Sequence, residues 1–221
     1  MEARLPRFWS LLLILVLLAP SLAAAPERWQ AEIDKLTASD ATQPPPAGAV
    51  VFVGSSSIRF WTSLATDFPG VVTINRGFGG SELADSVYYA DRLVIAYRPR
   101  AVVLYAGDND LWSGKTAEAV TADFTAFRTK IRAALPGAQI IYLAIKPSPA
   151  RTRVWPEAQR ANQLIAADCA RDPLCTFVDV ATPMLDGTGQ PRPELYREDR
   201  LHLLPAGYVL WTRILAPYLQ P

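Results

Sequence analysis

Five short apolar segments recur along the chain, and a glycine or a polar cluster closes most of them. They are residues 50–53, 71–74, 101–105, 140–145 and 176–180. β-branched and aromatic residues are frequent in these segments, and their nearly continuous apolar character is typical of strands buried on both faces. The pattern therefore predicts five strands of one parallel sheet, with the second strand ending before the polar residues 75–77.

Apolar residues at spacings of three and four lie between these segments. This periodicity predicts four helices after the first strand, over residues 83–97, 116–135, 157–170 and 206–218, and a short helix over residues 27–37. Strands that alternate with helices predict an α/β fold in which helices cover both faces of the sheet. In such sheets, binding sites form beyond the carboxyl ends of the strands, and chemistry is expected there.

The first 25 residues follow a different pattern. Arg4 and Arg7 precede an apolar run at residues 11–19, and small residues lead to Ala25. This arrangement is typical of a signal peptide, and the run is shorter than the roughly 20 residues that span a bilayer. We therefore expect export to the periplasm or the outside, and no membrane span in the mature protein. An uncleaved N-terminal anchor is the alternative.

The rest of the chain divides into two parts. Residues 26–47 are expected to form an N-terminal helix and a proline-rich connector, and residues 48–221 a single folded domain. Without residues 1–25, which hold two arginines and one glutamate, basic and acidic side chains number 20 each. A neutral chain without a basic cluster gives no reason to expect a nucleic acid or an anionic membrane as partner.

Metal-binding residues are scarce. Cys169 and Cys175 are the only cysteines, and His202 is the only histidine. This set is too small for a usual zinc site, and we expect no metal or other cofactor. In an exported protein the two cysteines could form a disulfide, and two buried thiols are the alternative.

Polar segments that follow the first three strands are candidates for chemistry. Ser55, Ser56 and Ser57 follow the first strand, where a helix N-terminus would place N–H groups beside a serine. Gly80 belongs to a glycine-rich segment after the second strand, and Asn109 follows the third strand. Glycines let the backbone approach a ligand closely. An asparagine amide can donate to an oxyanion. Each segment, taken alone, also fits a helix cap or a turn.

The last candidate precedes the final helix. Asp199 lies three residues before His202, so a turn would bring its carboxylate to the imidazole. Such a contact sets the tautomer of the ring and stabilises the imidazolium that forms when histidine accepts a proton. A single histidine with a structural or surface role is the alternative.

Together these segments resemble a known signature. Gly-x-Ser after the first strand, Gly after the second, Gly-x-Asn-Asp after the third and Asp-x-x-His before the last helix are similar to the motifs of SGNH (GDSL-like) hydrolases. The resemblance covers roughly residues 48–220 and is nearest to the platelet-activating-factor acetylhydrolase-like and lysophospholipase-like esterases. It implies a three-layer α/β/α, flavodoxin-like fold with a five-stranded parallel sheet in the order 2-1-3-4-5.

The resemblance also implies a catalytic triad. Ser56 would be the nucleophile, His202 the general base and Asp199 the residue that orients the histidine. Ser55 occupies a position where many members of the family carry aspartate. Because of this departure, Ser55 and Ser57 are alternative nucleophiles.

The same resemblance implies an oxyanion hole with three donors. These would be the N–H groups of Ser56 and Gly80 and the side-chain amide of Asn109. The two aspartates beside that asparagine, Asp108 and Asp110, are expected to support the loop rather than to act in catalysis.

Three residues are candidates for contact with substrate, and packing is their alternative role: Trp112, Lys146 and Trp155. The family implies a serine esterase that hydrolyses small-molecule carboxylic esters through an acyl-serine, without a cofactor. Short acyl or acetyl esters are the expected substrates, and lysophospholipid-type esters are a further class. The alternatives are an exported carbohydrate O-acetyl esterase, an acyltransferase and a non-catalytic binding module on the same fold.

Overall fold

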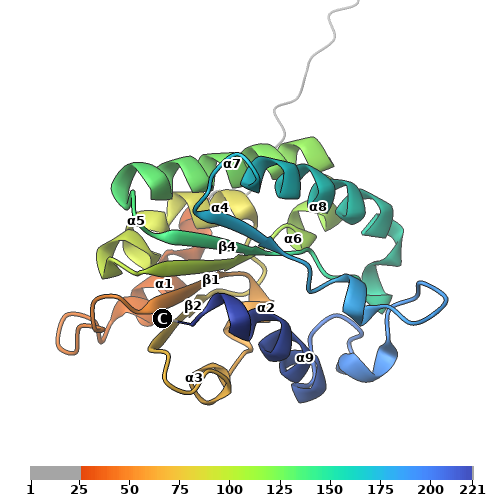
Figure 1. Cartoon of the computed structure of the whole chain (residues 1–221), viewed down its shortest axis with the longest axis horizontal. Helices are drawn as coiled ribbons and strands as arrows, with labels where there is room; N and C mark the ends of the chain where they lie inside the picture. The colour runs from red at the N-terminus through yellow and green to blue at the C-terminus, as the bar shows by residue number, and fades with distance from the viewer. Residues whose placement is uncertain (1–25, 221) are drawn as a thin grey trace, which may run out of the picture.

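The computed structural model describes residues 26–220, and the predicted signal peptide (residues 1–25) lies outside the described residues. One sheet of five parallel strands forms the middle of the molecule (Figure 1). The strands are β1 (Val50–Gly54), β2 (Thr73–Gly77), β3 (Ala101–Tyr105), β4 (Gln139–Leu143) and β5 (Cys175–Val178). Their order is β2-β1-β3-β4-β5, and every neighbouring pair is parallel. The predicted fold class and strand order are therefore confirmed.

Helices form a layer on each side of the sheet (Figure 1). One layer contains α1 (Gln30–Thr37), α4 (Leu83–Tyr88), α5 (Ala90–Leu93), α6 (Asp108–Trp112), α7 (Ala117–Ala134) and α8 (Trp155–Cys169). The other contains α2 (Ser56–Arg59), α3 (Leu64–Asp67) and α9 (Pro205–Leu215). Short 3-10 helices are η1 (Pro26–Trp29), η2 (Ile95–Tyr97), η3 (Pro149–Val154), η4 (Thr182–Met184), η5 (Pro193–Leu195) and η6 (Ala216–Tyr218).

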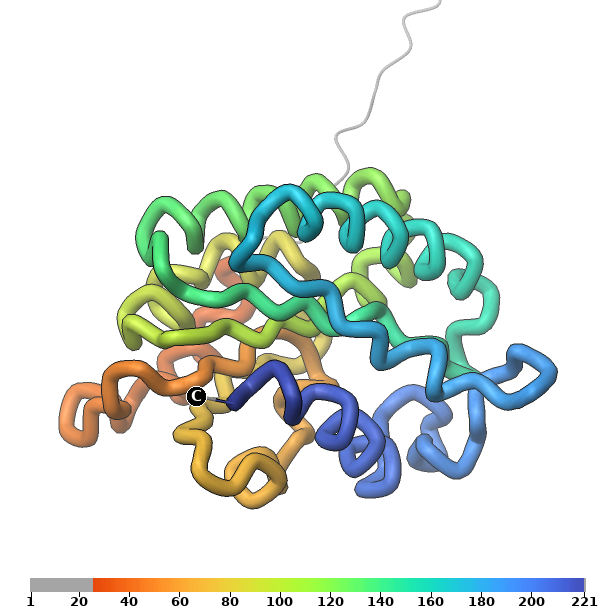
Figure 2. The backbone as a smooth tube through the Cα atoms, viewed as in Figure 1, coloured from red at the N-terminus to blue at the C-terminus, as the bar shows by residue number. Residues whose placement is uncertain are grey.

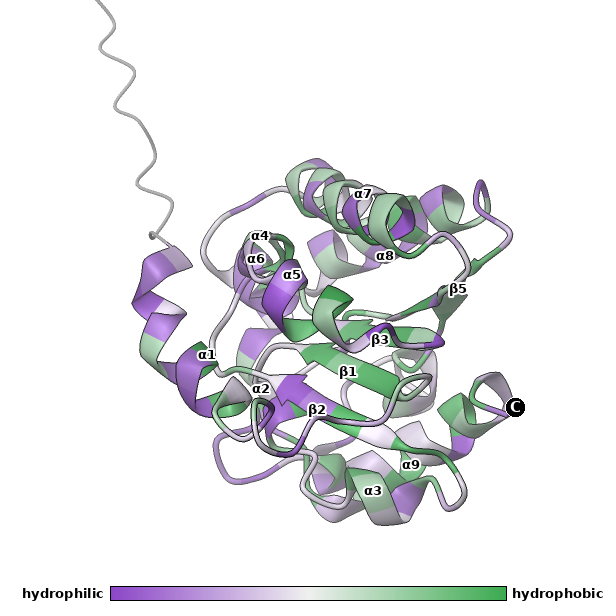
Figure 3. Cartoon of the chain, turned by 90° about the vertical axis from the view of Figure 1, so that its left-hand side faces the viewer, coloured by the Kyte–Doolittle hydropathy of each residue, from purple (hydrophilic) through white to green (hydrophobic). Residues whose placement is uncertain are grey.

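Two hydrophobic cores result from the alternation of side chains along each strand. In β1, Val51 and Val53 face one helical layer, whereas Val50 and Phe52 face the other. All four side chains are fully buried. Burial on both faces explains why β1 and β3 are continuously apolar, as Figure 3 shows.

Strand β2 lies two to three residues later than the sequence pattern predicts. Residues 71–74 were expected to form the strand, but the structure places it at Thr73–Gly77. Backbone pairing with β1 sets its bounds, and Val72 is 54% exposed in the preceding segment. As an edge strand, β2 tolerates polar residues whose side chains find partners: Asn75 donates to the carbonyl of Ile58 at 2.7 Å.

The prediction of a single helix over residues 83–97 is also wrong. The chain forms α4, α5 and η2 in this region instead. The breaks fall at Tyr89, with ψ of 6°, and at Val94, with φ of −132°. The hydroxyl of Tyr89 donates to the carbonyl of Pro26 at 3.0 Å, which ties the first break to the N-terminal segment. A tertiary contact therefore accompanies a break that local periodicity does not indicate.

The two cysteines meet at the end of α8 and the start of β5. Cys169 and Cys175 are buried free thiols with their Sγ atoms 2.7 Å apart. The structure brings the two sulfur atoms together, and a disulfide between them stays a prediction.

The C-terminal segment packs beside the start of the domain. Helices α3 and α9 lie together beneath the sheet in Figures 1 and 2. The rings of Trp61 and Trp211 are 5.9 Å apart in this layer, so α9 is held close to the segment that follows β1. Within residues 26–220, no helix is long and apolar enough to cross a bilayer.

We predict that Gly54→Ala strongly destabilises the protein. Gly54 has a φ of +130°, and an added Cβ would lie 1.9 Å from the carbonyl oxygen of Tyr105. Backbone strain and overlap with a neighbouring strand should together lower the free energy of unfolding by about 3 kcal/mol or more. Urea denaturation followed by circular dichroism measures the loss.

Gly114→Ala is the matched control. Gly114 also has a positive φ, +101°, but nothing lies within 4 Å of the position of an added Cβ. Only backbone strain remains, and the expected loss is about 1–2 kcal/mol. Equal losses in the two variants would contradict the steric role of Gly54.

Candidate active site

The turn from β1 into α2 presents one serine of three. Ser56 is the first residue of α2 and is partly exposed, whereas Ser55 and Ser57 are buried. The N–H of Ser55 donates to the carbonyl of Tyr105 at 3.0 Å, which holds the turn against the end of β3. The turn therefore places the Ser56 side chain at the carboxyl edge of the sheet.

The imidazole of His202 lies between Ser56 and Asp199. Its Nε2 is 3.0 Å from Oγ of Ser56, and its Nδ1 is 2.6 Å from Oδ2 of Asp199. The other carboxylate oxygen, Oδ1, accepts the N–H groups of Leu201 and His202 at 2.9 Å each. With the proton on Nδ1, the ring can accept the hydroxyl proton of Ser56 at Nε2.

The hydrogen bonds to Asp199 change its acidity. Partial burial raises the pKa of this carboxyl, but donation from the His202 ring and from the backbone N–H groups outweighs burial and lowers the pKa to about 2. Asp199 is therefore ionised at neutral pH and able to stabilise an imidazolium.

Two further contacts hold the histidine beside the serine. The ring of Phe60 meets the imidazole edge to face, with centroids 4.9 Å apart and planes at 90°. The hydroxyl of Tyr208, on α9, donates to the carbonyl of Ser57 on α2 at 3.0 Å. These contacts connect α2, which begins at Ser56, to His202 and to the helix α9 that follows it.

Gly80 lies three residues beyond the carboxyl end of β2, in a conformation that favours glycine. Its φ is +74°, and an added Cβ would lie 3.4 Å from the ring of Trp29. Among residues 26–220, no carbonyl or side chain accepts the N–H of Gly80 or of Ser56. Both groups are therefore available to a ligand.

The amide of Asn109 is oriented from both ends. Its Nδ2 donates to the carbonyl of Ser81 at 2.8 Å, and its Oδ1 accepts from Nη1 of Arg151 at 3.0 Å. One N–H of the amide remains for an oxyanion. The sequence indicated Asn109 but not the role of Arg151. The position of a basic residue in the segment after β4 does not show that it contacts Asn109.

Asp108 belongs to a buried charge cluster behind Asn109. Its Oδ2 lies 3.1 Å from Nζ of Lys146 and 3.4 Å from Nη1 of Arg151. Burial raises the pKa of Asp108, but the charges of Lys146 and Arg151 outweigh it and hold the pKa below its ordinary value. An ionised Asp108 in turn holds Arg151 against the amide of Asn109.

Asp110 connects the loop after β3 to helix α4. Its two carboxylate oxygens accept the N–H of Leu83 at 3.1 Å, and Oδ1 lies 3.0 Å from Nζ of Lys115. Burial raises the pKa of Asp110 to about 6, although Lys115 and the Leu83 N–H act in the opposite direction. Both aspartates beside Asn109 therefore hold the loop, as the sequence led us to expect.

The three residues predicted to contact substrate differ in exposure. Lys146 is 4% exposed, and its ammonium also donates to the hydroxyl of Tyr105, so the structure places it inside the buried cluster. Trp112 is 45% exposed at the end of α6, and Trp155 is half-buried at the start of α8. Contact of the tryptophans with substrate stays a prediction.

The N-terminal segment supports the glycine-rich loop. Nε1 of Trp29 donates to Asp85 at 3.0 Å, and the N–H of Gly79 donates to Glu32 at 3.4 Å. Helical spacing in the sequence does not reveal which surface a short helix covers, so this role appears only in the structure.

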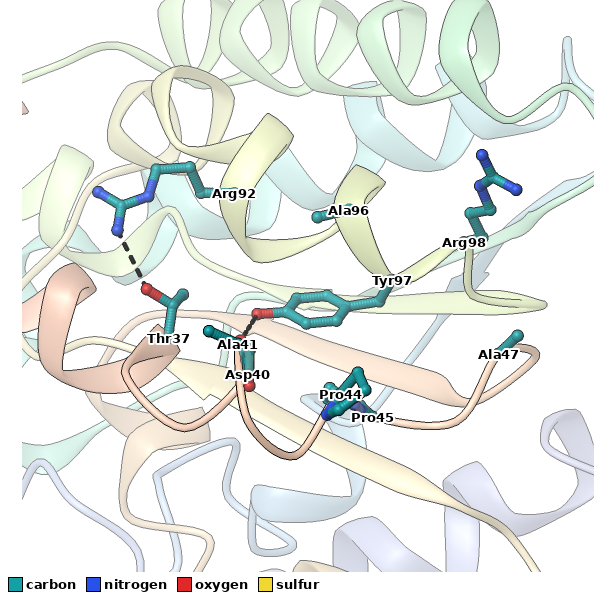
Figure 4. A pocket seen from close by; sticks show the side chains of 10 residues that line it. All are labelled: Thr37, Asp40, Ala41, Pro44, Pro45, Ala47, Arg92, Ala96, Tyr97 and Arg98. Atoms are coloured by element: carbon teal, nitrogen blue, oxygen red, sulfur yellow. Dashed lines mark hydrogen bonds between the residues drawn. The ribbon is translucent and has the colours of Figure 1, made fainter.

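A pocket of about 500 Å³ lies on another part of the molecule (Figure 4). Its lining comes from residues 37–47 and 92–98, which precede β1 and β3 and so lie near the amino ends of the strands. Tyr97 and Asp40 are hydrogen-bonded to each other at its centre (Figure 4). The pocket is therefore separate from the carboxyl edge that carries Ser56.

Within the described residues, no group of three or more histidine, cysteine or acidic side chains could hold a metal ion.

Comparison with solved structures supports the fold. A Streptococcus pneumonia protein named for platelet activating factor is 21% identical with a TM-score of 0.78, over 87% of this chain and 94% of that one. A GDSL-like lipase from Bacteroides thetaiotaomicron is 20% identical with a TM-score of 0.70, over 88% and 96% of the two chains. An acetylxylan esterase from Geobacillus stearothermophilus is 15% identical with a TM-score of 0.64, over 79% and 95%. At these identities the likeness shows the fold alone.

Comparison of the sequence gives the family. No curated protein matches the chain, but the model of the GDSL-like lipase/acylhydrolase family matches residues 25–210. This match spans most of the 221 residues and includes every residue of the Ser56–His202–Asp199 arrangement. The chain belongs to the GDSL-like lipase/acylhydrolase family.

Proposed function

We propose that the protein is a serine esterase in which Ser56, His202 and Asp199 form the catalytic triad. The observation that carries the proposal is the line of two hydrogen bonds, from Oγ of Ser56 to Nε2 and from Nδ1 to Asp199. Family membership supports the hydrolysis of ester bonds. Of the three adjacent serines, only Ser56 has a hydroxyl within hydrogen-bond distance of the imidazole in residues 26–220.

Acylation begins with proton transfer. His202 accepts the hydroxyl proton of Ser56 as Oγ attacks the carbonyl carbon of the ester, and a tetrahedral oxyanion forms. The imidazolium, stabilised by ionised Asp199, then donates its proton to the leaving alcohol oxygen as the C–O bond breaks. An acyl-serine and a free alcohol result.

Deacylation repeats these steps with water. His202 takes a proton from water, the hydroxide oxygen attacks the acyl carbon, and Oγ of Ser56 leaves with the proton that the imidazolium returns. The products are a carboxylic acid and the regenerated enzyme, so atoms and charges balance.

The oxyanion is held by groups that are already in place. The N–H groups of Ser56 and Gly80 have no acceptor among the described residues, and Asn109 is oriented by Arg151 and Ser81. Fixed donors of this kind stabilise developing charge without the cost of reorientation during the reaction. We propose short acyl or acetyl esters as substrates, and lysophospholipid-type esters as a further class.

We predict that Ser56→Ala abolishes esterase activity while the fold is retained. Removal of a catalytic nucleophile should lower kcat by on the order of 10⁴ or more. Hydrolysis of p-nitrophenyl esters of increasing acyl length, with circular dichroism as the check on folding, measures the effect. Ser57→Ala is the control for the alternative nucleophile, and undiminished turnover by Ser56→Ala would refute the triad.

We predict that Asn109→Ala keeps the fold but loses turnover. Removal of one oxyanion donor should lower kcat by roughly 10²–10³. The effect should appear in kcat rather than KM, because the donor binds the transition state more strongly than the substrate. Steady-state kinetics on p-nitrophenyl acetate measure both constants, and near-normal kcat would exclude Asn109 from the oxyanion hole.

We predict a stability difference at acidic pH. The pKa of Asp199 is about 2 in the folded protein, against an ordinary value of 3.8. A carboxyl with a lowered folded pKa stabilises the protein above its unfolded pKa, and this stability disappears as pH falls through the folded pKa. The stability of the parent should therefore fall more steeply between pH 4 and pH 2 than that of Asp199→Asn. Urea denaturation of both proteins across this pH range measures the difference. If the stabilities of the two proteins fall in parallel with pH, the lowered pKa of Asp199 is contradicted.

A further inference from the structure

Two arginines stack on an aromatic ring next to the imidazole of His202. The ring of Phe60 contacts His202, with centroids 4.9 Å apart. The guanidinium carbons of Arg197 and Arg59 lie 4.8 and 5.7 Å from the centroid of the same ring. One side of the catalytic pair is therefore bordered by a Phe60 stack, which consists of Phe60, Arg59 and Arg197.

A second stack, also of one aromatic ring and two arginines, borders the proposed oxyanion side. The guanidinium carbons of Arg153 and Arg151 lie 5.0 and 5.5 Å from the centroid of the Trp112 ring. Arg151 also donates to the amide oxygen of Asn109. This Trp112 stack, of Trp112, Arg151 and Arg153, thus places a second pair of guanidinium groups next to a proposed oxyanion donor.

In each stack, one arginine is paired and one is free. Arg59 and Arg151 lie 3.3 and 3.4 Å from a carboxylate oxygen. Arg153 and Arg197 are exposed, and neither forms an ion pair with any residue from 26 to 220. Arg197 donates only through Nε, to the carbonyl of Leu203 at 3.1 Å, so both of its terminal nitrogens are unoccupied.

The acidic residues that follow Arg197 in the sequence do not neutralise it. Asp199 is engaged by His202 and by two backbone N–H groups. Glu198 is exposed, and within the described part of the chain it makes no ion pair with Arg197 or Arg153. Arg197 therefore brings a guanidinium without an ion pair to the ring that contacts His202, and Arg153 brings another to the Trp112 ring, which Arg151 connects to Asn109.

Stacked arginine is well suited to bind oxyanions. The guanidinium is planar, and its N–H fork matches the two oxygens of a carboxylate or phosphate. Contact with an aromatic face adds a cation–π attraction and restricts the side chain before ligand arrives, which lowers the entropic cost of binding. A neutral ester substrate would make no use of this arrangement.

We propose that Arg153 and Arg197 recognise an oxyanion on the substrate, so that the preferred substrate is an ester that carries a carboxylate or a phosphate. This inference rests on the proposed esterase function and adds the chemical class of the substrate. A phosphate would indicate a lipid-type ester, and a carboxylate an ester of an acidic sugar or a similar organic acid.

Matched acetate esters test the proposal. The substrates are methyl 4-acetoxybenzoate, which is neutral, and 4-acetoxybenzoate and 4-acetoxyphenyl phosphate, which are anionic. The wild-type protein should have a higher kcat/KM for at least one anionic ester than for the neutral one. This preference should fall roughly tenfold in R153Q and in R197Q, because each loses a charge-assisted hydrogen-bonding group. It should also fall as salt is added.

R213Q is the matched control. Arg213 is another exposed arginine, near the end of α9, and it forms no ion pair with the described residues. Arg213 lies in the last turn of α9, whereas His202 precedes the first turn. Its replacement removes the same charge at the other end of the helix, so the preference for the anionic ester should be retained.

The outcomes separate this inference from the proposed function. If the neutral ester is hydrolysed in a Ser56-dependent manner but the anionic esters are not preferred, or R153Q and R197Q preserve the wild-type preference, the oxyanion site is refuted and the esterase stands. If no ester is hydrolysed, calorimetric titration of S56A with 4-acetoxybenzoate and 4-acetoxyphenyl phosphate decides the question. Binding that R197Q removes supports the site, and absence of binding overturns it.

Discussion

The hydrogen bond between Nε2 of His202 and Oγ of Ser56 is the contact on which the proposed chemistry depends. It joins residues 146 positions apart, one directly after β1 and one just before α9, so only the tertiary fold brings the two groups together. Both ends of this contact are held by the layer of α2, α3 and α9. The stacking of Trp61 on Tyr208, with centroids 5.2 Å apart, is one of the aromatic contacts that fix α9 against the chain that leaves β1. The position of His202, the proposed general base, therefore depends on hydrophobic packing in this layer.

Electrostatic contacts are the second constraint on the site, because they hold Asn109 and the charged residues behind it in place. Asn109 lies in the short helix α6, and Arg151 and the carbonyl of Ser81 hold its amide. Arg151 is itself held by the buried Asp108, which Lys146 also neutralises. Buried charges are costly unless they are paired, and here the pairs create a rigid support for one neutral amide. The loop after β4 thus supports Asn109, the proposed oxyanion donor, and supplies no donor of its own.

Much of the architecture follows from local sequence patterns. The apolar segments identify β1, β3, β4 and β5, because strands buried on both faces appear in the sequence as nearly continuous runs of apolar residues. The pattern fails at β2, an edge strand whose bounds depend on pairing with β1, and at Tyr89, where contact with the N-terminal segment accompanies a break in the helix. It also gives no indication that Trp29 packs over Gly80, since the partner of an amphipathic helix is decided by the other elements.

The sequence by itself determined the fold class, the family and the set of residues that could act, because each depends on residue types at short spacings. Asp199 and His202 are three positions apart, and their contact requires only a turn. The tertiary structure alone decided which serine of residues 55–57 faces the imidazole, which side chains hold Asn109, and which arginines are left without a partner beside the site. These are distances between residues far apart in the chain. They are set when the two helical layers pack on the sheet, and no local pattern records them.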